Sequence, residues 1–266
     1  MKELRTDYDV ILLGCSCYAM GRAAGAPDKC LIIESGEGLG GEFIDALRAG
    51  DRPVERPLGD GAAFYDELIS RGIMDECSAA HGGVHLPAVN VVLNRMALER
   101  GLNILFRTRV FGIRRVQQGY ELDAVCNAQT YVFTCRRLVD TRSTDFARIR
   151  RLDPDAQFAL SANMHIEGEV PSTMGAFKLS RGYLPGEVYA HYAVEQPASG
   201  DRERLLSAFE ARPAMWLGAR LLTVAHAYAV WSKPLREQTD IGEYVPGCGF
   251  SDPVAAWAAG LAEGVQ

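Results

Sequence analysis

The sequence predicts an α/β fold, in which a parallel sheet carries a three-stranded antiparallel meander and a small α+β lobe completes the chain. Two short apolar runs rich in Val and Ile, Tyr8–Leu13 and Cys30–Ile33, flank a helical stretch over residues 16–24. Further along, apolar and polar residues alternate in 120–125 and again in 130–135. The first pattern is typical of a strand–helix–strand unit, and the second of paired antiparallel strands.

The first unit has the spacing of a dinucleotide-binding element. Its helix over 16–24 is stopped by Gly25 and Pro27. In such units the helix N-terminus faces a pyrophosphate, and an acidic residue about 20 positions on accepts hydrogen bonds from a ribose. Gly14 and Glu34 fit that spacing. Glu34 is therefore the leading candidate for a cofactor contact, and a solvated carboxylate at a strand end is the alternative.

The pattern of apolar residues also predicts the helix, the strands and the hairpin turn that follow. Apolar residues at helical spacing predict a helix over 89–98, which Gly101 ends, and a strand over Leu102–Phe106. A hairpin turn is predicted at 116–120, between alternating stretches. The last strand of this region, Leu138–Asp140, ends in a polar turn.

The remaining middle of the chain predicts the small lobe. Residues 158–168 and 187–195 have the character of strands, and residues 201–222 have a helical pattern. About 90 residues are left for this lobe, so a site on it is expected to be shallow or to be completed by a second chain.

Several stretches together carry a resemblance to a known family: YDVILLGCSCYA, CLIIES, GLGGEF, NVVLNRMALERGLNILFRTRV and GCGFSDPVAAWAAGLAEG. They resemble the FAD-dependent oxidoreductases that have a glutathione-reductase-like, Rossmann-type flavin domain. The resemblance covers roughly residues 7–45, 88–145 and 244–266. It implies a discontinuous FAD-binding-like domain of residues 1–150 and 244–266, and a small substrate or cap lobe of residues 151–243.

The resemblance also implies a set of cofactor contacts. The residues at the matching positions are Gly14, Ser16, Ala19, Glu34, Ser35, Gly40, Gly41, Val110 and Asp252. Asp252 precedes Pro253, so it is also expected to cap the last helix. In the family, that helix start points at the pyrimidine end of the flavin.

Three departures from the family pattern bear on function. The turn that should read GxGxxG is degenerate, with Ser16 and Ala19 in place of its second and third glycines. The second glycine normally lets the backbone approach the pyrophosphate. The first helix is about one turn shorter than is usual in the family. A later turn reads Thr-Arg-Ser over 141–143, where the family usually has Ala-Thr-Gly.

Two functions are considered on this evidence, of which the first is favoured and the second is the alternative. The first is a compact FAD-dependent oxidoreductase that acts on a small organic substrate by flavin-mediated hydride transfer. The second is a non-catalytic subunit of the same fold, with weak or lost FAD binding, that partners another oxidoreductase chain. A plain NAD-binding enzyme explains the start of the chain but neither the meander nor the C-terminal segment.

No residue can be assigned a catalytic role from the sequence. His81 and His85 flank a glycine pair in a predicted loop, and His191 lies on a predicted strand of the lobe. These three are candidates for proton transfer, with simple packing as the alternative. Cys15 and Cys17 have no further ligands near them in sequence, so no metal site is expected.

The charge and the apolar runs of the sequence limit the classes of binding partner that we expect. The formal net charge is −6, and no basic cluster argues for a nucleic-acid partner; the basic run 148–151 is expected to be a solvated loop. No apolar run reaches the roughly 18 residues of a membrane span, and the start lacks a signal-peptide core. We expect a cytoplasmic protein that meets a small-molecule substrate, and either forms a homo-oligomer or joins a partner oxidoreductase subunit.

Overall fold

The computed structural model describes residues 5–50 and 52–264. Within these residues eight strands form a mixed sheet, whose main path runs β12-β13-β6-β1-β2-β3. Neighbouring strands from β13 to β3 are parallel, while β12 is antiparallel to β13. The bounds of these strands are β1 (Asp7–Leu13), β2 (Cys30–Ile33), β3 (Ile104–Leu105), β6 (Gln129–Asp140), β12 (Glu237–Thr239) and β13 (Gly242–Tyr244). The predicted parallel sheet is confirmed.

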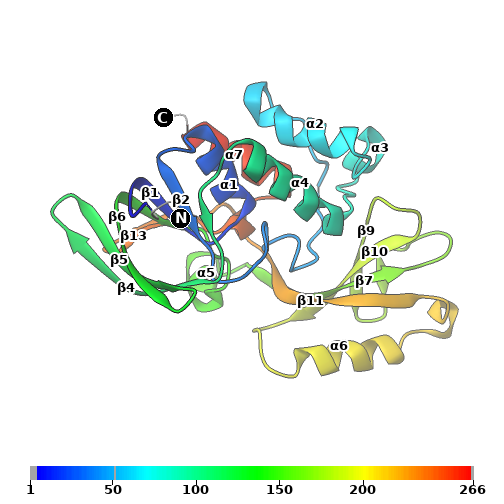
Figure 1. Ribbon diagram of the computed structural model, residues 1–266. Coiled ribbons are helices and arrows are strands. Elements are labelled where there is room, and N and C mark those ends of the chain that lie inside the picture. The colour runs from blue at the N-terminus through cyan, green and yellow to red at the C-terminus, as the bar shows by residue number, and fades with distance from the viewer. Residues whose placement is uncertain (1–4, 51, 265–266) are drawn as a thin grey trace.

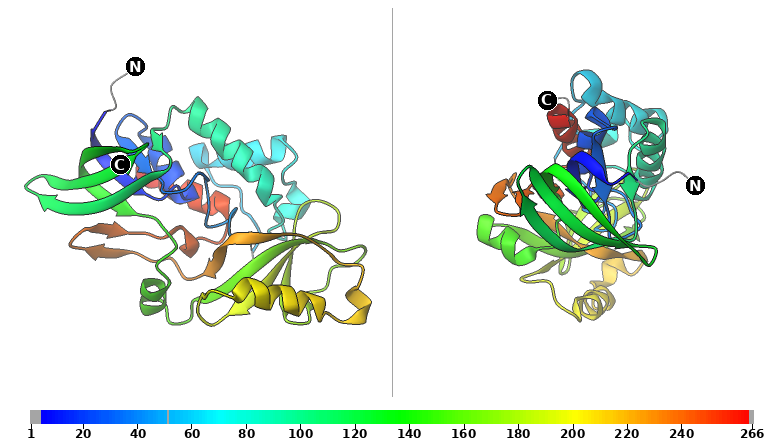
Figure 2. Two further views of the ribbon diagram at one scale, coloured as in Figure 1. Left: turned by 60° about the horizontal axis from the view of Figure 1, so that its bottom comes forward. Right: turned by 60° about the vertical axis from the view of Figure 1, so that its left-hand side comes forward.

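The predicted meander is confirmed as well. Strands β4 (Thr108–Val116) and β5 (Gly119–Cys126) pair with each other, and β5 pairs with β6, both in antiparallel fashion. Every second residue of β5 is buried, which is the alternation that the sequence shows. Figure 2 shows the β12–β13 hairpin beside this meander.

Helices cover one face of the larger sheet (Figure 1). The first and last of them, α1 (Cys17–Gly25) and α7 (Pro253–Gly264), pack at backbone contact because glycines lie at the crossing. A Cβ added at Gly21 would lie 2.0 Å from the carbonyl oxygen of Trp257, and one at Gly260 would lie 2.0 Å from that of Tyr18. The other helices of this part are α2 (Ala62–Ser70), α3 (Glu76–Ala79) and α4 (Leu86–Glu99).

The lobe is built on an antiparallel sheet of order β11-β7-β10-β9-β8, against which α6 packs (Figures 1 and 2). This confirms the predicted α+β lobe. Its elements are β7 (Gln157–His165), β8 (Thr173–Met174), β9 (Phe177–Arg181), β10 (Glu187–Val194), α6 (Asp201–Glu210) and β11 (Arg220–Trp231). Strand β12 lies inside the range assigned to the lobe but belongs to the larger sheet. The domain division at residues 150 and 244 stays a prediction.

Two local expectations were wrong. The helical pattern over 201–222 continues past the real end of α6 at Glu210, because Pro213 follows and cannot donate a backbone hydrogen bond. The chain there turns into a short 3-10 helix (Ala214–Trp216) and then into β11. Residues 148–151, expected in a loop, belong to α5 (Phe146–Leu152), whose N-cap Asp145 accepts a hydrogen bond from the amide of Arg148.

No helix in the described ranges 5–50 and 52–264 is long and apolar enough to cross a membrane.

Candidate functional site

The turn between β1 and α1 needs a glycine at its first position. Gly14 has φ +91°, and a Cβ there would lie 2.7 Å from Cγ of Arg142. Ser16 is the N-cap of α1, and its Oγ accepts a hydrogen bond of 3.0 Å from the amide of Ala19. The substituted second position of the motif thus serves as a helix cap.

A cavity of about 420 Å³ opens in front of this turn, and we refer to it as the turn cavity. It lies between the turn, the segment that follows β2, the turn after β6 and one part of β11. Five of the predicted cofactor contacts line it: Gly14, Ser16, Glu34, Ser35 and Gly41. Glu37, Glu42, Asp45, Arg142 and His226 add charged or titratable side chains to its wall.

Glu34 is held rigidly at the wall of the turn cavity. One of its carboxylate oxygens accepts a hydrogen bond of 2.8 Å from the amide of Cys15, and the other accepts one of 2.7 Å from the amide of Gly36. This carboxylate thus lies just after β2 and beside the turn, and its contact with a cofactor stays a prediction. Its oxygens retain lone pairs for a hydroxyl donor in the cavity.

Glu42 is the second carboxylate at the turn, and no motif or spacing in the sequence singles it out. Its Oε1 accepts a hydrogen bond of 2.8 Å from the amide of Cys17, the first residue of α1. A Cβ at Gly247 would lie 2.8 Å from the same oxygen, so the loop before α7 closes over it. Burial raises the pKa of Glu42 to about 7, although the Cys17 hydrogen bond and Arg48 lower it.

Arg48 lies outside the lining of the turn cavity, against the loop that precedes α7. Its guanidinium donates hydrogen bonds to the carbonyl oxygens of Cys248, at 3.2 Å, and Phe250, at 2.6 Å. It also lies over the rings of Phe43 and Trp231. Arg48 is buried to 2% exposure, so a buried cation of the chain itself occupies the space in front of the last helix.

These contacts test whether the residues fit FAD. At the adenosine end they fit, because Glu34 faces the cavity. At the pyrophosphate position they do not fit. The amides of Cys15, Cys17 and Ala19 all donate to side-chain oxygens of the chain, and the Glu42 carboxylate lies where a phosphate would bind. Before α7, where the resemblance implies the flavin ring, the carbonyl oxygens of Cys248 and Phe250 accept hydrogen bonds from Arg48.

The other predicted contacts lie away from the turn cavity. Ala19 is buried inside α1, and Val110 is half-buried on β4. A Cβ at Gly40 would lie 3.0 Å from both Cys17 Sγ and Leu93 Cδ1, so Gly40 serves close packing. Asp252 is buried and caps α7, as predicted, by accepting a hydrogen bond of 2.8 Å from the amide of Ala255. Cofactor contact at these positions stays a prediction.

The three candidate histidines are not brought together. His81 is exposed, and His85 Nδ1 lies 2.7 Å from Oε1 of Glu187. His191 is buried in the lobe sheet, with Nδ1 2.9 Å from the hydroxyl of Ser161. Burial, helped by nearby Lys178 and Arg48, lowers the pKa of His191 to about 3. None of the three lines the turn cavity.

A fourth histidine does line the turn cavity, and sequence reasoning missed it. His226 lies in β11, where the pairing with β7 shifts register between Val224 and Tyr228. The amides of His226 and Ala227 both donate to the carbonyl oxygen of Asp45, at 2.9 and 3.1 Å. This bulge directs the strand toward the turn cavity. The only sequence signal for the bulge is a break in the alternation of apolar and polar residues in β11. That break does not predict that the bulge bonds to Asp45.

The two thiols at the turn, Cys15 and Cys17, are buried. Burial raises the pKa values of both thiols well above the usual range, with Glu34 and Glu42 adding to the shift at Cys15 and Glu42 adding to it at Cys17. Among residues 5–50 and 52–264, no cluster of three or more His, Cys, Asp or Glu side chains is arranged to hold a metal ion.

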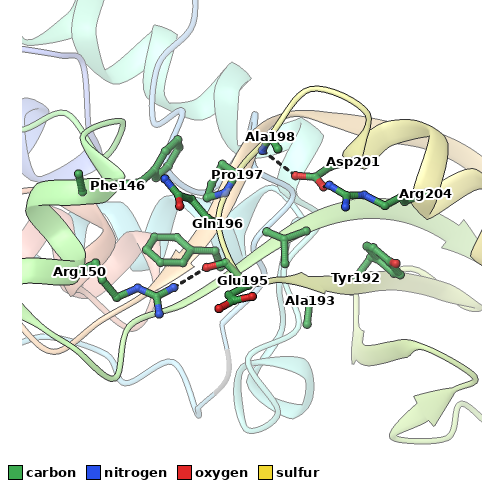
Figure 3. Close-up of a pocket in the computed structure, with 13 residues that line it drawn as sticks. Phe146, Arg150, Tyr192, Ala193, Glu195, Gln196, Pro197, Ala198, Asp201 and Arg204 are labelled. Carbon is green, nitrogen blue, oxygen red and sulfur yellow. Dashed lines mark hydrogen bonds and ion pairs between the residues drawn. The ribbon is translucent and has the colours of Figure 1, made fainter.

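A wider cavity of about 790 Å³ lies on the lobe side, between α5, the end of β10 and the start of α6 (Figure 3). Three of its charged side chains, Arg150, Asp201 and Arg204, bond to neighbouring protein groups. Arg150 donates to the carbonyl oxygen of Glu195 at 2.6 Å, and Asp201 accepts from the amide of Ala198 at 2.9 Å and pairs with Arg204. No predicted site residue lines it, so the turn cavity is the candidate site.

No protein-family model and no curated protein matches the sequence. Solved structures do share the fold. L-Proline dehydrogenase from P. horikoshii aligns with a TM-score of 0.60 at 10% identity, over 98% of this chain and 93% of that one. Glycine oxidase from Geobacillus kaustophilus gives 0.60 at 15% identity, over 97% and 93%. The p-nitrophenol 4-monooxygenase from Pseudomonas putida DLL-E4 gives 0.60 at 12%, over 94% and 77%.

The predicted Rossmann-type fold of FAD-dependent oxidoreductases is thereby confirmed. The chain has the fold of a dehydrogenase, an oxidase and a monooxygenase. Identities of 10–15% establish that shared fold and leave the chemistry to the residues of the site.

Proposed function

We propose that this chain is a non-catalytic protein of the flavoenzyme fold, which binds FAD weakly or not at all and partners another oxidoreductase chain. The single observation that carries the proposal is the hydrogen bond of 2.8 Å from the Cys17 amide to the Glu42 carboxylate. An anion already occupies the N-terminus of the helix where the fold would place a pyrophosphate.

The charge of the turn cavity supports the same proposal. Its wall carries the acidic side chains Glu34, Glu37, Glu42 and Asp45. The arginine at the wall, Arg142, makes two hydrogen bonds of 2.8 Å to the carboxylate of Asp140. A pyrophosphate would therefore meet like charges, and in a partly desolvated cavity that repulsion is stronger than in bulk water.

The partner chain is supported by exposed apolar side chains on the lobe. Met215, Leu217 and Leu222 are all more than 60% exposed within eight residues of sequence. The partners that we propose are an oxidoreductase subunit and a second copy of this chain. Sedimentation of the chain alone detects self-association, and sedimentation of the chain mixed with a candidate subunit detects the complex between them. The expected cytoplasmic location remains part of this proposal.

Two observations favour a second function. Glu34 is positioned to accept from ribose hydroxyls, and the turn cavity reaches His226 on the lobe. A compact FAD-dependent oxidoreductase that acts on a small organic substrate by hydride transfer would use both features. It requires Glu42 and Arg48 to move out of the positions where they are now bonded.

Thermal unfolding with and without FAD separates the two functions. A ligand at 100 times its Kd stabilises the folded state by about 2.7 kcal/mol. We expect no increase of the melting temperature with excess FAD at about pH 8. An increase that Glu34→Gln abolishes would establish binding through the ribose contact and would favour the enzyme.

A further inference from the structure

We propose that the cavity of about 790 Å³ between α5, the end of β10 and the start of α6 is a binding site for a small aromatic carboxylate. We refer to it as the lobe cavity. Its volume lies in the range of roughly 300–1,000 Å³ that is usual for cavities that hold small ligands. Among the described residues, Phe146 alone lines both the lobe cavity and the turn cavity. The inference therefore adds a second site and does not depend on whether FAD binds in the turn cavity.

The floor of the lobe cavity is apolar and aromatic. Phe158 of β7 lies opposite Val194 of β10 in the sheet, and both pack with Phe146 of α5. The rings of Phe146 and Phe158 meet edge to face, with 5.7 Å between their centroids. Tyr192 precedes Val194 by two residues, so it adds a further ring on the same face of the sheet. These rings offer a surface on which a flat aromatic body packs.

The lobe cavity lies on the far side of the sheet from the place where the resemblance implies the flavin ring. Tyr192 points to the face that carries α5 and α6, and its neighbour His191 points to the opposite face. There the ring of His191 lies 5.0 Å from that of Trp231, and Arg48 lies over the other side chain of this pair, Trp231. A ligand in the lobe cavity would therefore be separated from that place by the sheet itself.

One guanidinium group enters the lobe cavity from each of two walls, Arg150 from α5 and Arg204 from α6 (Figure 3). Arg150 lies over the ring of Phe158, at 4.7 Å from its centroid, and donates to the carbonyl oxygen of Glu195 at 2.6 Å. Neither of these described partners of Arg150 carries a negative charge. A guanidinium has five N–H donors in a planar fork, so Arg150 is held in position and keeps donors for a carboxylate.

The two carboxylates at the wall leave this cation in place. Asp201 is 1% exposed, accepts from the Ala198 amide and the Tyr228 hydroxyl, each at 2.9 Å, and pairs with Arg204. Its charge is thus balanced at the start of α6. Glu195 is exposed, so water and salt screen its charge. The guanidinium of α5 is therefore the charge that a bound molecule meets, and it favours an anion.

The probe is 2-naphthoate, which has a flat apolar ring system and a carboxylate that is ionised at about pH 7. Its neutral counterpart, 2-naphthamide, has nearly the same shape. Calorimetric titrations compare wild type with Arg150→Gln, which removes the cation, and with Ala147→Trp, which fills the cavity from α5. Arg151→Gln is the matched control, because Arg151 is the next residue of α5, is 61% exposed and pairs with Glu237.

We expect wild type and Arg151→Gln to bind one 2-naphthoate per chain with the same affinity. Arg150→Gln should bind it at least about tenfold more weakly, and wild type should bind 2-naphthamide more weakly by a similar factor, because each change removes the charge-assisted bond. Ala147→Trp should bind neither probe, and it serves if Arg150→Gln is unstable. Glu195→Gln should bind 2-naphthoate about twofold more tightly, because a screened like charge is removed.

The inference is overturned if wild type binds no 2-naphthoate at millimolar concentration. It is equally overturned if Arg150→Gln and Ala147→Trp bind the probe as tightly as wild type, which would place the probe elsewhere on the chain. Equal affinities of wild type for 2-naphthoate and 2-naphthamide would also contradict it, since the charge of the ligand would then not be recognised. The titrations contain no FAD, so each of these outcomes leaves the proposed function standing.

Discussion

Oε1 of Glu42 lies 2.8 Å from the backbone nitrogen of Cys17, at the first residue of α1. This pair places a carboxylate of the chain on the amide that the fold otherwise offers to a phosphate. The fold is that of FAD-dependent oxidoreductases, and in the function that we propose this carboxylate stands in place of a pyrophosphate.

Replacing Glu42 by Gln should stabilise the protein at neutral and alkaline pH. The pKa of Glu42 is raised from 4.5 to about 7 in the folded state, so folding binds a proton in that window and the ionised form destabilises the fold above it. Gln keeps an acceptor for Cys17 without the charge. We expect a gain of about 1–2 kcal/mol at about pH 8, less than the full shift implies because the cavity admits water, and no gain at about pH 4. Urea unfolding at both pH values measures it, and equal gains at both would contradict it.

Gly21→Ala should destabilise the protein strongly, because its Cβ would lie 2.0 Å from the carbonyl oxygen of Trp257. The α1–α7 pair must then separate, and we expect a loss of more than about 3 kcal/mol in the free energy of unfolding. Gly218→Ala is the matched control, since a Cβ there meets no atom within 4 Å. Equal melting temperatures of the two variants would refute the close helix contact.

Arg22 ties α1 to α7 from a buried position with 1% exposure. Its Nη1 lies 3.2 Å from the Tyr18 hydroxyl and 3.5 Å from Glu263. Arg22→Met should cost about 2–3 kcal/mol, below the usual loss for a broken buried pair because Arg236 still pairs with Glu263. Arg95→Met removes an exposed pair and should cost under about 0.5 kcal/mol in the same denaturant series. Similar losses for both would show that burial of Arg22 is immaterial.

Glu187 joins the lobe to the N-terminus of α4. Its buried carboxylate accepts from the Tyr189 hydroxyl at 2.8 Å and from the Leu184 amide at 3.1 Å, and it lies 2.7 Å from His85. Glu187→Ala removes the acceptor of the Leu184 amide and the partner of His85, and it leaves the Tyr189 hydroxyl only its longer bond of 3.2 Å to the carbonyl oxygen of Val84, so we expect a loss of about 3 kcal/mol or more. Exposed Glu195 supplies the control variant Glu195→Ala. Limited proteolysis should cleave only the Glu187 variant faster, and unchanged cleavage would count against the link.

The parts of this structure that sequence predicts are those set by local pattern. The strand–turn–helix start, the meander and the capping role of Asp252 all follow from short stretches with one dominant physical reason. Glu34 lies beside the first turn, as its spacing predicts, because a parallel strand fixes where the residue after it lies relative to the neighbouring turn.

The features that the sequence does not predict depend on contacts between residues that are far apart along the chain. Glu42 reaches Cys17 across 25 residues of sequence, and no spacing rule covers the segment between β2 and α2. His226 enters the turn cavity through a bulge whose partner, Asp45, lies far away in sequence. The helix predicted over 201–222 is too long, because the apolar periodicity of the sequence continues through Pro213 although α6 ends at Glu210.

The visible absorbance spectrum of the purified protein, taken after incubation with excess FAD at about pH 8 and desalting, tests the central claim most directly. Occupation of the helix end by Glu42 and of the ring end by Arg48 predicts a spectrum without flavin bands. Flavin bands retained in stoichiometric amount would contradict it, because both side chains would then have to leave the positions described here.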